Sequence, residues 1–487
     1  MKKQDKGLSA WQLTMMALGT VIGGSFFLGS AVAIHTAGPG VIISYLLGGA
    51  LVYVILVALS EMTVADPAPG SFRTFAEQAY GTGVGFVVGW VYWSGLVLAM
   101  SSEATAVSII LQTWLPGTSL LLLGSVVIIG VSFLNLLGAD QLSKLESGLA
   151  AIKLFAIIGF ILLGAALIGG FMPGAATVGV GELLAEPLLP AGIGGIAGSM
   201  LIVMFTYAGF EIIGLAATEA ENPYETVPRA IRYTVISLVG LYVLSILVLL
   251  PLIPTTALTA EESPLALALT RWNLGWAGNV MTIVLVTAIL STMLAAMFGL
   301  GRMIKSLAEE GHAPLWLKDK GEMPYRGIVF SGIAMLVALA LGFLLPQQVY
   351  LFLVSSGGFA LLFSYVVILA THYKLRKRNG CVNGKCQLPG YPTTSWVALV
   401  GILLIIASMP LVPGQGAGLA AGLVVVALFS AIYIGKKLYQ KRYYSQDKPM
   451  RENVSTRGLL QQQEMQFEIA KEVAIDQEKV KKKEKRT

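Results

Sequence analysis

Long apolar runs recur along the whole chain and constrain its fold more than any other feature. Each run is about 20 residues long, enough for a helix to cross a hydrocarbon core about 30 Å thick. Only 12% of the residues are charged and the mean hydropathy is +0.75, so the runs do not suit a water-soluble core. The sequence therefore predicts an all-α polytopic membrane protein with twelve transmembrane helices, at about 11–34, 39–64, 84–112, 119–138, 147–170, 193–217, 230–253, 274–301, 327–345, 348–371, 394–412 and 415–435.

The basic residues fall almost entirely on one side of the predicted membrane. Of the 33 Lys and Arg residues, Arg271 lies in an outer loop and Lys153 inside the fifth span, and the others share a side with both termini. The positive-inside rule then predicts a multi-pass plasma-membrane protein with both termini in the cytoplasm. The net charge of +6 reflects this topology and contact with the lipid bilayer, and it does not indicate a nucleic-acid partner.

The chain carries no pattern typical of an enzyme, a metal centre or a cofactor site. Its three histidines, His35, His312 and His372, lie at span ends or in loops, and H-E-x-x-H and G-x-S-x-G motifs are absent. Cys381 and Cys386 lie in the predicted loop between spans ten and eleven and are too few ligands for a structural zinc site. We expect reduced thiols there, with a metal pair or a redox switch as the alternatives.

Two of the predicted spans contain residues that weaken a helix at the middle of the membrane. The first holds four glycines and three hydroxyl residues between Ala17 and Ser30, and the sixth contains the stretch FTYAGFE, residues 205–211. Non-helical backbone at membrane depth is tolerated where it is buried in protein or lines a cavity, and close helix packing at small residues is the alternative. Interruptions five spans apart predict two inverted repeats of five spans, with a substrate site near the midplane.

Paired breaks of this kind suit a zwitterionic ligand. The amide N–H groups that open a half-helix attract an anion, and the carbonyls that end the preceding half-helix attract a cation. A free α-amino acid carries a carboxylate and an ammonium group side by side. The breaks therefore predict recognition of the carboxylate by amides and of the ammonium group by carbonyls.

Several stretches resemble the amino acid permeases of the amino acid–polyamine–organocation superfamily, in the bacterial amino acid transporter branch. The match runs in the family's order from about residue 10 to 440. The stretches that carry it are VIGGSFFLGSAVAIHTAGP, SEMTVADPAPGSFRTFAEQAYG, GFVVGWVYWSG, LESGLAAIKLFAIIGF, FTYAGFEIIGLAATEAENPYETVPRAI and GRMIKSLAEEGHAP. The resemblance implies the leucine-transporter fold. It has five-helix repeats at 11–170 and 193–371, two extra helices at 394–435, a cytoplasmic N-terminus at 1–10 and a charged cytoplasmic tail at 436–487.

The resemblance also implies the residues of the substrate site. Carboxylate contacts are expected at the first break and ammonium contacts at carbonyls on both breaks, with Phe205 as an aromatic gate. The family pattern at the first break is Gly-hydroxyl-Gly, whereas here the hydroxyl is displaced by one residue, to Ser25. The implied substrate-binding residues are Ile22, Gly23, Gly24, Ser25, Phe205, Tyr207, Ala208 and Gly209. Met100, Leu294 and Phe298 are expected to line a side-chain pocket that favours a neutral substrate, aliphatic or small.

Three of the ionisable residues within the predicted spans are candidates for a functional role: Lys153, Glu103 and Glu211. Relatives carry a lysine at the position of Lys153, where sodium-coupled relatives bind a cation, and snorkelling to the interface is the alternative. The eighth span offers no side-chain oxygen for sodium between Met293 and Gly301. The ammonium group of Lys153 is expected to donate hydrogen bonds to the carbonyls from Gly19 to Ile22. Burial favours loss of its proton, so we expect Lys153 to couple transport to protons. Glu103 is expected to pair within the bundle, with a role in coupling as the alternative. Glu211 is expected to cap or brace the second break, with direct substrate contact as the alternative.

The sequence thus predicts a secondary active transporter that takes up a neutral amino acid by proton symport through alternating access. An amino acid exchanger is the main alternative, and a channel or a transport-dead amino acid sensor with the same fold is a further one. The expected partners are the free amino acid, protons and lipid. No enzymatic activity, cofactor or metal is expected.

Overall fold

The computed structural model describes residues 7–66, 68, 70–137, 139–172, 177–216, 220–259, 262–321, 323–344, 349–381 and 387–444. The β pairing among these residues is one isolated bridge between Leu8 and Ala220, and the rest of the regular structure is helical. The chain divides into two units, 1–429 and 430–487, and the residues of the sites described below lie in the first. The α-helices are α1 (Ala10–Val21), α2 (Gly24–Phe27), α3 (Gly29–Ala37), α4 (Val41–Ala65), α5 (Phe72–Tyr80), α6 (Thr82–Trp114), α7 (Leu120–Asn135), α8 (Ala139–Gly169), α9 (Gly192–Thr206), α10 (Ile212–Ala216), α11 (Pro223–Leu252), α12 (Pro264–Arg271), α13 (Gly275–Glu309), α14 (Tyr325–Leu344), α15 (Val349–Asn379), α16 (Thr393–Ser408) and α17 (Gly416–Tyr444).

Nine helical segments of the described residues are long and apolar enough to cross a membrane. They are Gly24–Ala65, Thr82–Trp114, Gly148–Gly169, Pro223–Leu252, Gly275–Glu309, Tyr325–Phe343, Phe352–Asn379, Thr393–Leu411 and Gly416–Tyr439. Helices α7 and α9 are apolar but only 16 and 15 residues long, and the first predicted span is divided among α1, α2 and α3. The all-α polytopic class agrees with the sequence, whereas twelve spans and the inverted repeat stay predictions.

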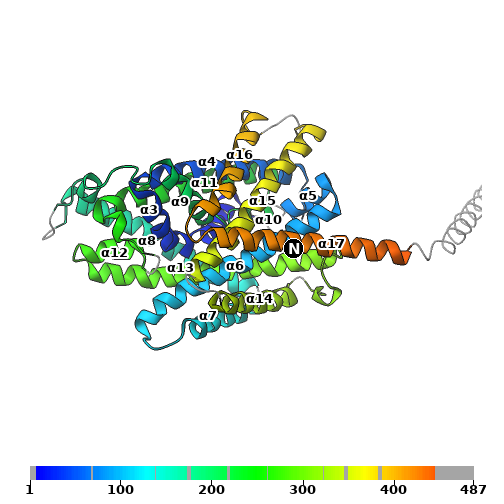
Figure 1. Ribbon diagram of the computed structural model, residues 1–487, viewed down its shortest axis with the longest axis horizontal. Coiled ribbons are helices and arrows are strands. Elements are labelled where there is room, and N and C mark those ends of the chain that lie inside the picture. Colours follow the sequence, from blue (N-terminus) through cyan, green and yellow to red (C-terminus); the bar gives the residue numbers. More distant parts are fainter. Residues whose placement is uncertain are drawn as a thin grey trace, which may run out of the picture. The chain divides into compact units, whose positions relative to one another are not determined.

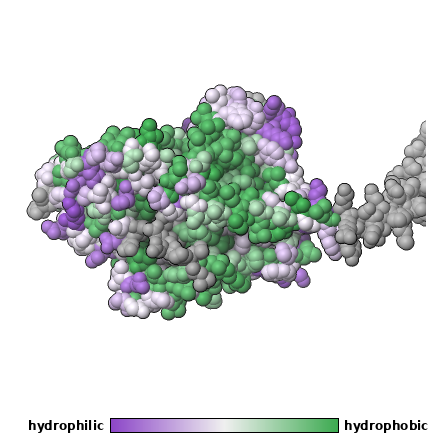
Figure 2. All heavy atoms as spheres, viewed as in Figure 1, coloured by the Kyte–Doolittle hydropathy of each residue, from purple (hydrophilic) through white to green (hydrophobic). Residues whose placement is uncertain are grey.

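Large apolar side chains cover much of the surface of the bundle (Figure 2). On α7, Val126 and Phe133 are 60% and 63% exposed, and on α8, Phe155 and Leu162 are 73% and 66% exposed. Exposed apolar surface of this extent is unfavourable in water and suits contact with lipid tails. The first unit therefore has the surface of a multi-pass membrane protein.

The helices pack so that segments far apart in the sequence meet around the first break. Helix α6 packs against α7, α13, α14 and α15, and Figure 1 shows α6, α13 and α14 running alongside one another. Helix α1 packs against α8, α10, α11 and α13, while α3 and α4 pack against α9. Helix α1 thus packs against α8, which carries Lys153, and against α10, which follows Glu211 directly.

Both predicted interruptions are confirmed. Helix α1 ends at Val21 and α2 begins at Gly24, with the two intervening residues in extended conformations. Helix α9 ends at Thr206 and α10 begins at Ile212, and between them Gly209 has φ +105°. A Cβ atom on Gly209 would also lie 3.1 Å from the carbonyl oxygen of Thr20. The left-handed backbone and this close approach both require glycine at the second break.

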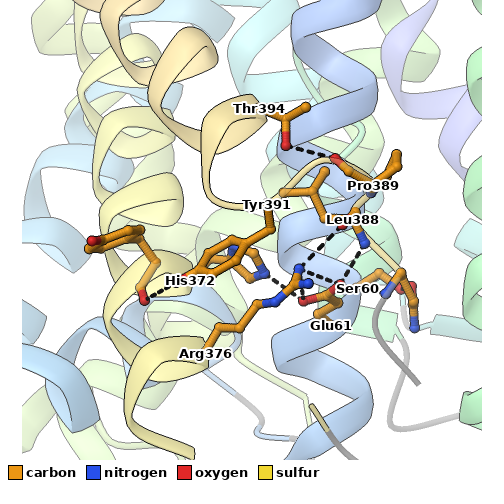
Figure 3. Close-up of polar contacts among 10 residues, drawn as sticks. Ser60, Glu61, His372, Arg376, Leu388, Pro389, Tyr391 and Thr394 are labelled. Carbon is orange, nitrogen blue, oxygen red and sulfur yellow. Dashed lines mark hydrogen bonds and ion pairs between the residues drawn. The ribbon is translucent and has the colours of Figure 1, made fainter. Parts of the chain in front are cut away.

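The connection between α15 and α16 is fixed to the end of α4 by Glu61 (Figure 3). The Glu61 carboxylate accepts hydrogen bonds from the backbone N–H groups of Gln387 (2.5 Å) and Leu388 (2.6 Å). It also pairs with Arg376 (3.2 Å) and with Nε2 of His372 (2.6 Å), both on α15. We call this set the Glu61 junction. The sequence analysis did not predict it, because Glu61 lies more than 300 residues from its partners in the chain.

One expectation about the cysteines is wrong. Cys381, which follows α15, is disulfide-bonded, whereas a reduced thiol was expected. Whether two thiols are oxidised depends on the redox conditions of the compartment, and the sequence does not specify these conditions. Cys386, and the part of the predicted tail from 445 to 487, lie outside the described residues.

Candidate functional site

The amides that open α2 bind a carboxylate of the protein itself. Glu103, on α6, accepts a hydrogen bond from the Gly24 N–H at Oε2 (2.9 Å) and from the Ser25 N–H at Oε1 (3.0 Å). Amides in the first turn of a helix have no partner within the helix, so an ionised carboxylate satisfies them. These two amides are among those at which the sequence predicts the carboxylate of the substrate.

The carbonyls that end α1 bind an ammonium group. Lys153, which is fully buried on α8, donates from Nζ to the carbonyl oxygens of Gly19 and Ile22, the latter at 2.8 Å. Its Nζ lies 3.5 Å from Oγ1 of Thr292 on α13, and the Thr292 hydroxyl itself donates to the Ile22 carbonyl (3.2 Å). The first break therefore holds an anion at its amides and a cation at its carbonyls.

Glu211 stabilises the second break from its other side. Its Oε2 accepts from the Gly209 N–H (3.1 Å), and its Oε1 accepts from the hydroxyl of Tyr92 (3.0 Å). The Tyr365 hydroxyl donates to Oε2 at 3.5 Å. Thr20, on α1, donates from Oγ1 to the carbonyl of Gly209 (3.2 Å), so one hydrogen bond joins the two breaks directly.

A cavity of about 60 Å³ lies between the breaks, and we call it the central cavity. From the residues selected in the sequence, its lining includes Ser25, Met100, Glu103, Phe205, Ala208, Gly209 and Glu211. Helix α13 contributes Thr292, Ala295, Ala296 and Gly299 to this lining. Leu294 and Phe298, the pocket residues expected on that helix, are not part of it: Leu294 is buried elsewhere, and the guanidinium of Arg302 lies over the Phe298 ring at 5.1 Å.

Tyr207 belongs to a buried aromatic cluster and does not line the central cavity. Its hydroxyl donates to the carbonyl of Tyr45 (3.1 Å), and its ring lies 6.0 Å and 5.2 Å from the rings of Tyr45 and Tyr242. Phe26, on α2, stacks on Tyr242 with ring centroids 3.9 Å apart. Because Phe26 follows the first break in the chain, this cluster fills the bundle on the side of the break away from α1.

A second cavity, of about 380 Å³, lies on the α1 side of the breaks. It is lined by Leu8, Trp11, Gln12, Met15, Met16, Gly19, Thr20, Glu146, Ala150, Ser291 and Ala295, and we call it the N-terminal vestibule. Thr20 and Ala295 also line the central cavity, so the two spaces adjoin. Trp11 is 64% exposed, which places part of the vestibule wall at the molecular surface.

Sequence reasoning missed four hydroxyl groups that organise the site. Thr292 directly precedes the stretch from Met293 in which no side-chain oxygen was found, so a window longer by one residue would have included it. Thr20 lies inside the glycine-rich stretch of the first span, and Tyr92 inside the quoted GFVVGWVYWSG stretch, but neither carried a signal that tied it to a break. Tyr365 had no such signal either.

Comparison with known proteins identifies the family. The profile of the amino acid permease family matches residues 12–449. The chain is 32% identical to a γ-aminobutyric acid permease of Bacillus subtilis over 434 residues, 87% of this chain and 92% of the relative. It is 31% identical to an aromatic amino acid transport protein of Escherichia coli K12 over 416 residues, 84% of this chain and 91% of the relative. The chain therefore belongs to the amino acid permease family, whose members are membrane transporters of amino acids rather than enzymes.

Proposed function

We propose that this permease takes up a neutral L-amino acid, aliphatic or small, together with protons and by alternating access. The observation that carries the proposal is the position of Glu103, whose carboxylate occupies the amides of Gly24 and Ser25. The carboxylate of an amino acid is the same chemical group and can accept the same two hydrogen bonds. The substrate therefore binds by replacing Glu103 at these amides.

The ammonium group of the substrate needs carbonyl acceptors close by. The carbonyl of Ile22 already accepts hydrogen bonds from Lys153 and Thr292. The carbonyls at the end of α9, at Phe205 and Ala208, are the ones we assign to the substrate, since both residues line the central cavity. In this arrangement the second break binds the ammonium group of the substrate, and the first break binds its carboxylate.

Replacement of Glu103 gives a physical reason for proton coupling. Two ionised carboxylates at one pair of amides repel each other, and the repulsion favours protonation of one of them. A proton that neutralises Glu103 weakens its hold on the amides and frees them for the substrate. Coupling thus follows from competition between two carboxylates for one site.

The proposed transport needs no sodium, because Lys153 takes the place of a sodium ion. Its ammonium group lies among three oxygens, the carbonyls of Gly19 and Ile22 and the hydroxyl of Thr292, where a coupling cation would otherwise find ligands. Loss of its proton would release these carbonyls when the end of α1 moves. Lys153 is therefore the second proton-carrying group that we propose.

The two cavities and the aromatic cluster support alternating access. The N-terminal vestibule adjoins the central cavity on the α1 side, while the aromatic cluster fills the opposite side of the first break. With the orientation predicted from the basic residues, this conformation faces the cytoplasm. Selectivity for a neutral side chain follows because the displaced Glu103 is protonated and Glu211 is engaged by hydrogen bonds, which leaves a charged side chain without a counter-ion.

Transport by the purified protein in liposomes tests the proposal. A thermal-shift panel of the twenty amino acids and γ-aminobutyrate first selects the substrate, because ligands stabilise the folded state that binds them. We expect this substrate to accumulate under an inside-alkaline pH gradient, without sodium and without an internal amino acid. Uptake that requires an internal amino acid would indicate an exchanger, and a sodium requirement would contradict proton symport. Stabilisation by a polyamine or a purine alone would contradict the substrate class.

A further inference from the structure

A half-buried glutamate lines the N-terminal vestibule outside the substrate site. Glu146 is near the start of α8, and its Oε1 is buried with no hydrogen-bond partner among the described residues. The rest of the vestibule lining consists of apolar side chains together with Gln12, Thr20 and Ser291. An unsatisfied buried carboxyl oxygen costs free energy, so its presence calls for an explanation.

Glu146 and Lys153 lie on the same face of one helix. Seven residues separate them, which is two helical turns, or about 10 Å along the axis. Side chains on a helix tilt toward its N-terminus, so Lys153 extends in the direction of Glu146. Gly19, whose carbonyl accepts a hydrogen bond from Lys153, lines the same vestibule as Glu146. The vestibule has room for about twelve water molecules at about 30 Å³ each, enough to bridge the remaining gap.

The charges near Glu146 allow it to gain and lose a proton. Glu146 lies outside the membrane-spanning segment Gly148–Gly169, and burial raises its pKa to about 7, while the nearby charge of Lys153 acts in the opposite direction. Lys153 in turn interacts with Glu103 on α6. The parts of α1 and α13 that line the vestibule contribute hydroxyl, amide and apolar groups but no charged side chain.

We propose that Glu146 is the acceptor for the proton that leaves Lys153 on the α1 side of the bundle. The ammonium group of Lys153 gives a proton to a water molecule in the vestibule as that water passes a proton to the Glu146 carboxylate. This leaves a neutral amine and a neutral carboxylic acid. Glu146 then releases the proton to bulk water, in the predicted orientation the cytoplasm. This inference rests on the proposed proton symport and adds the exit route of the proton.

Two transport assays on the full-length protein in liposomes test the role of Glu146. Uptake driven by an inside-alkaline gradient requires net proton release inside, whereas counterflow at equal pH on both sides exchanges substrate without it. Glu146→Gln should slow gradient-driven uptake by about tenfold or more and change counterflow by less than about twofold. Glu146→Asp, which keeps the acid, should recover part of the uptake. The control is Glu225→Gln, at an exposed ion pair with Arg229, and it should leave both assays unchanged.

The dependence on internal pH gives a readout that a purely structural role would not change. At a constant pH difference across the membrane, wild-type uptake should slow as the internal pH falls through about 7, because a protonated Glu146 cannot accept another proton. The Glu146→Gln variant should lose this dependence. The assignment would be overturned if the Glu146→Gln variant kept the uptake rate and the pH dependence of the wild-type protein. It would also be overturned if the variant lost uptake and counterflow equally. Failure of wild-type uptake to follow the pH gradient would instead contradict proton symport itself.

Discussion

The competition between Glu103 and the substrate predicts that Glu103→Gln will bind substrate more tightly than the wild-type protein. The side chain keeps its size but loses its charge and one acceptor oxygen, so it can hold only one of the two amides. A hydrogen bond to a charged group contributes about 1.5–3 kcal/mol and a neutral one about 0.5–1.5 kcal/mol. With two charged hydrogen bonds against one neutral bond, the wild-type side chain holds the amides more strongly by about 2.5–4.5 kcal/mol, and the substrate must overcome this difference.

The Kd of the substrate, measured between about pH 5.5 and 8.5, is the assay for this prediction. Every 1.4 kcal/mol is tenfold in Kd, so the variant should bind at least about tenfold more tightly at neutral pH. Wild-type binding should strengthen as the pH falls, because a protonated Glu103 gives up the amides more easily, and the variant should lose this trend.

The matched control is Glu211→Gln. Glu211 lines the same cavity and accepts hydrogen bonds from one amide and two tyrosine hydroxyls, but its amide belongs to the second break. This variant should not gain affinity. A Glu103→Gln protein that folds normally but binds substrate equally or more weakly, with the wild-type pH trend, would refute the competition.

Substitutions at three further positions test the backbone site, proton coupling and the Glu61 junction. A Cβ atom on Gly24 would meet the carboxylate that binds there and lie 2.8 Å from Ile289, so Gly24→Val should abolish substrate binding while membrane insertion continues; normal transport would make this stretch only a packing surface. Lys153→Ala should retain some binding and lose accumulation against a gradient, and Lys153→Arg should not rescue it, because arginine does not release its proton; full pH-driven accumulation by either variant would exclude Lys153 from coupling. Glu61→Ala should lower the free energy of unfolding by about 3–5 kcal/mol, because a buried histidine and an arginine lose their carboxylate partner. The control Glu225→Ala, at an exposed ion pair, should lower it by about 0.5 kcal/mol or less, and equal losses for the two variants in thermal unfolding would contradict the Glu61 junction.

The backbone breaks could be predicted because their cause is local. Glycines and hydroxyl residues crowded into an apolar run weaken a helix wherever it packs, and both interruptions lie where the sequence placed them. The hydrogen bonds from Lys153 to the carbonyls of Gly19 and Ile22 also follow from a cation inside a span that must find acceptors.

Contacts between distant helices could not be predicted in the same way. Glu103 lies 79 residues from Gly24, and its placement depends on the rotation of α6 about its own axis. A shift of one residue turns a helical side chain by about 100°, and this is why Ala295 and Gly299 line the cavity where Leu294 and Phe298 were expected. The Glu61 junction depends on the path of a connection, which no apolar periodicity encodes.

The central claim is that the amides of Gly24 and Ser25 bind the carboxylate of the substrate after Glu103 leaves them. A structure of the protein with its amino acid bound tests this most directly. The account predicts a substrate carboxylate oxygen within about 3 Å of both amide nitrogens, with the Glu103 side chain displaced from them. Substrate bound elsewhere in the cavity, with Glu103 still accepting both hydrogen bonds, would contradict it.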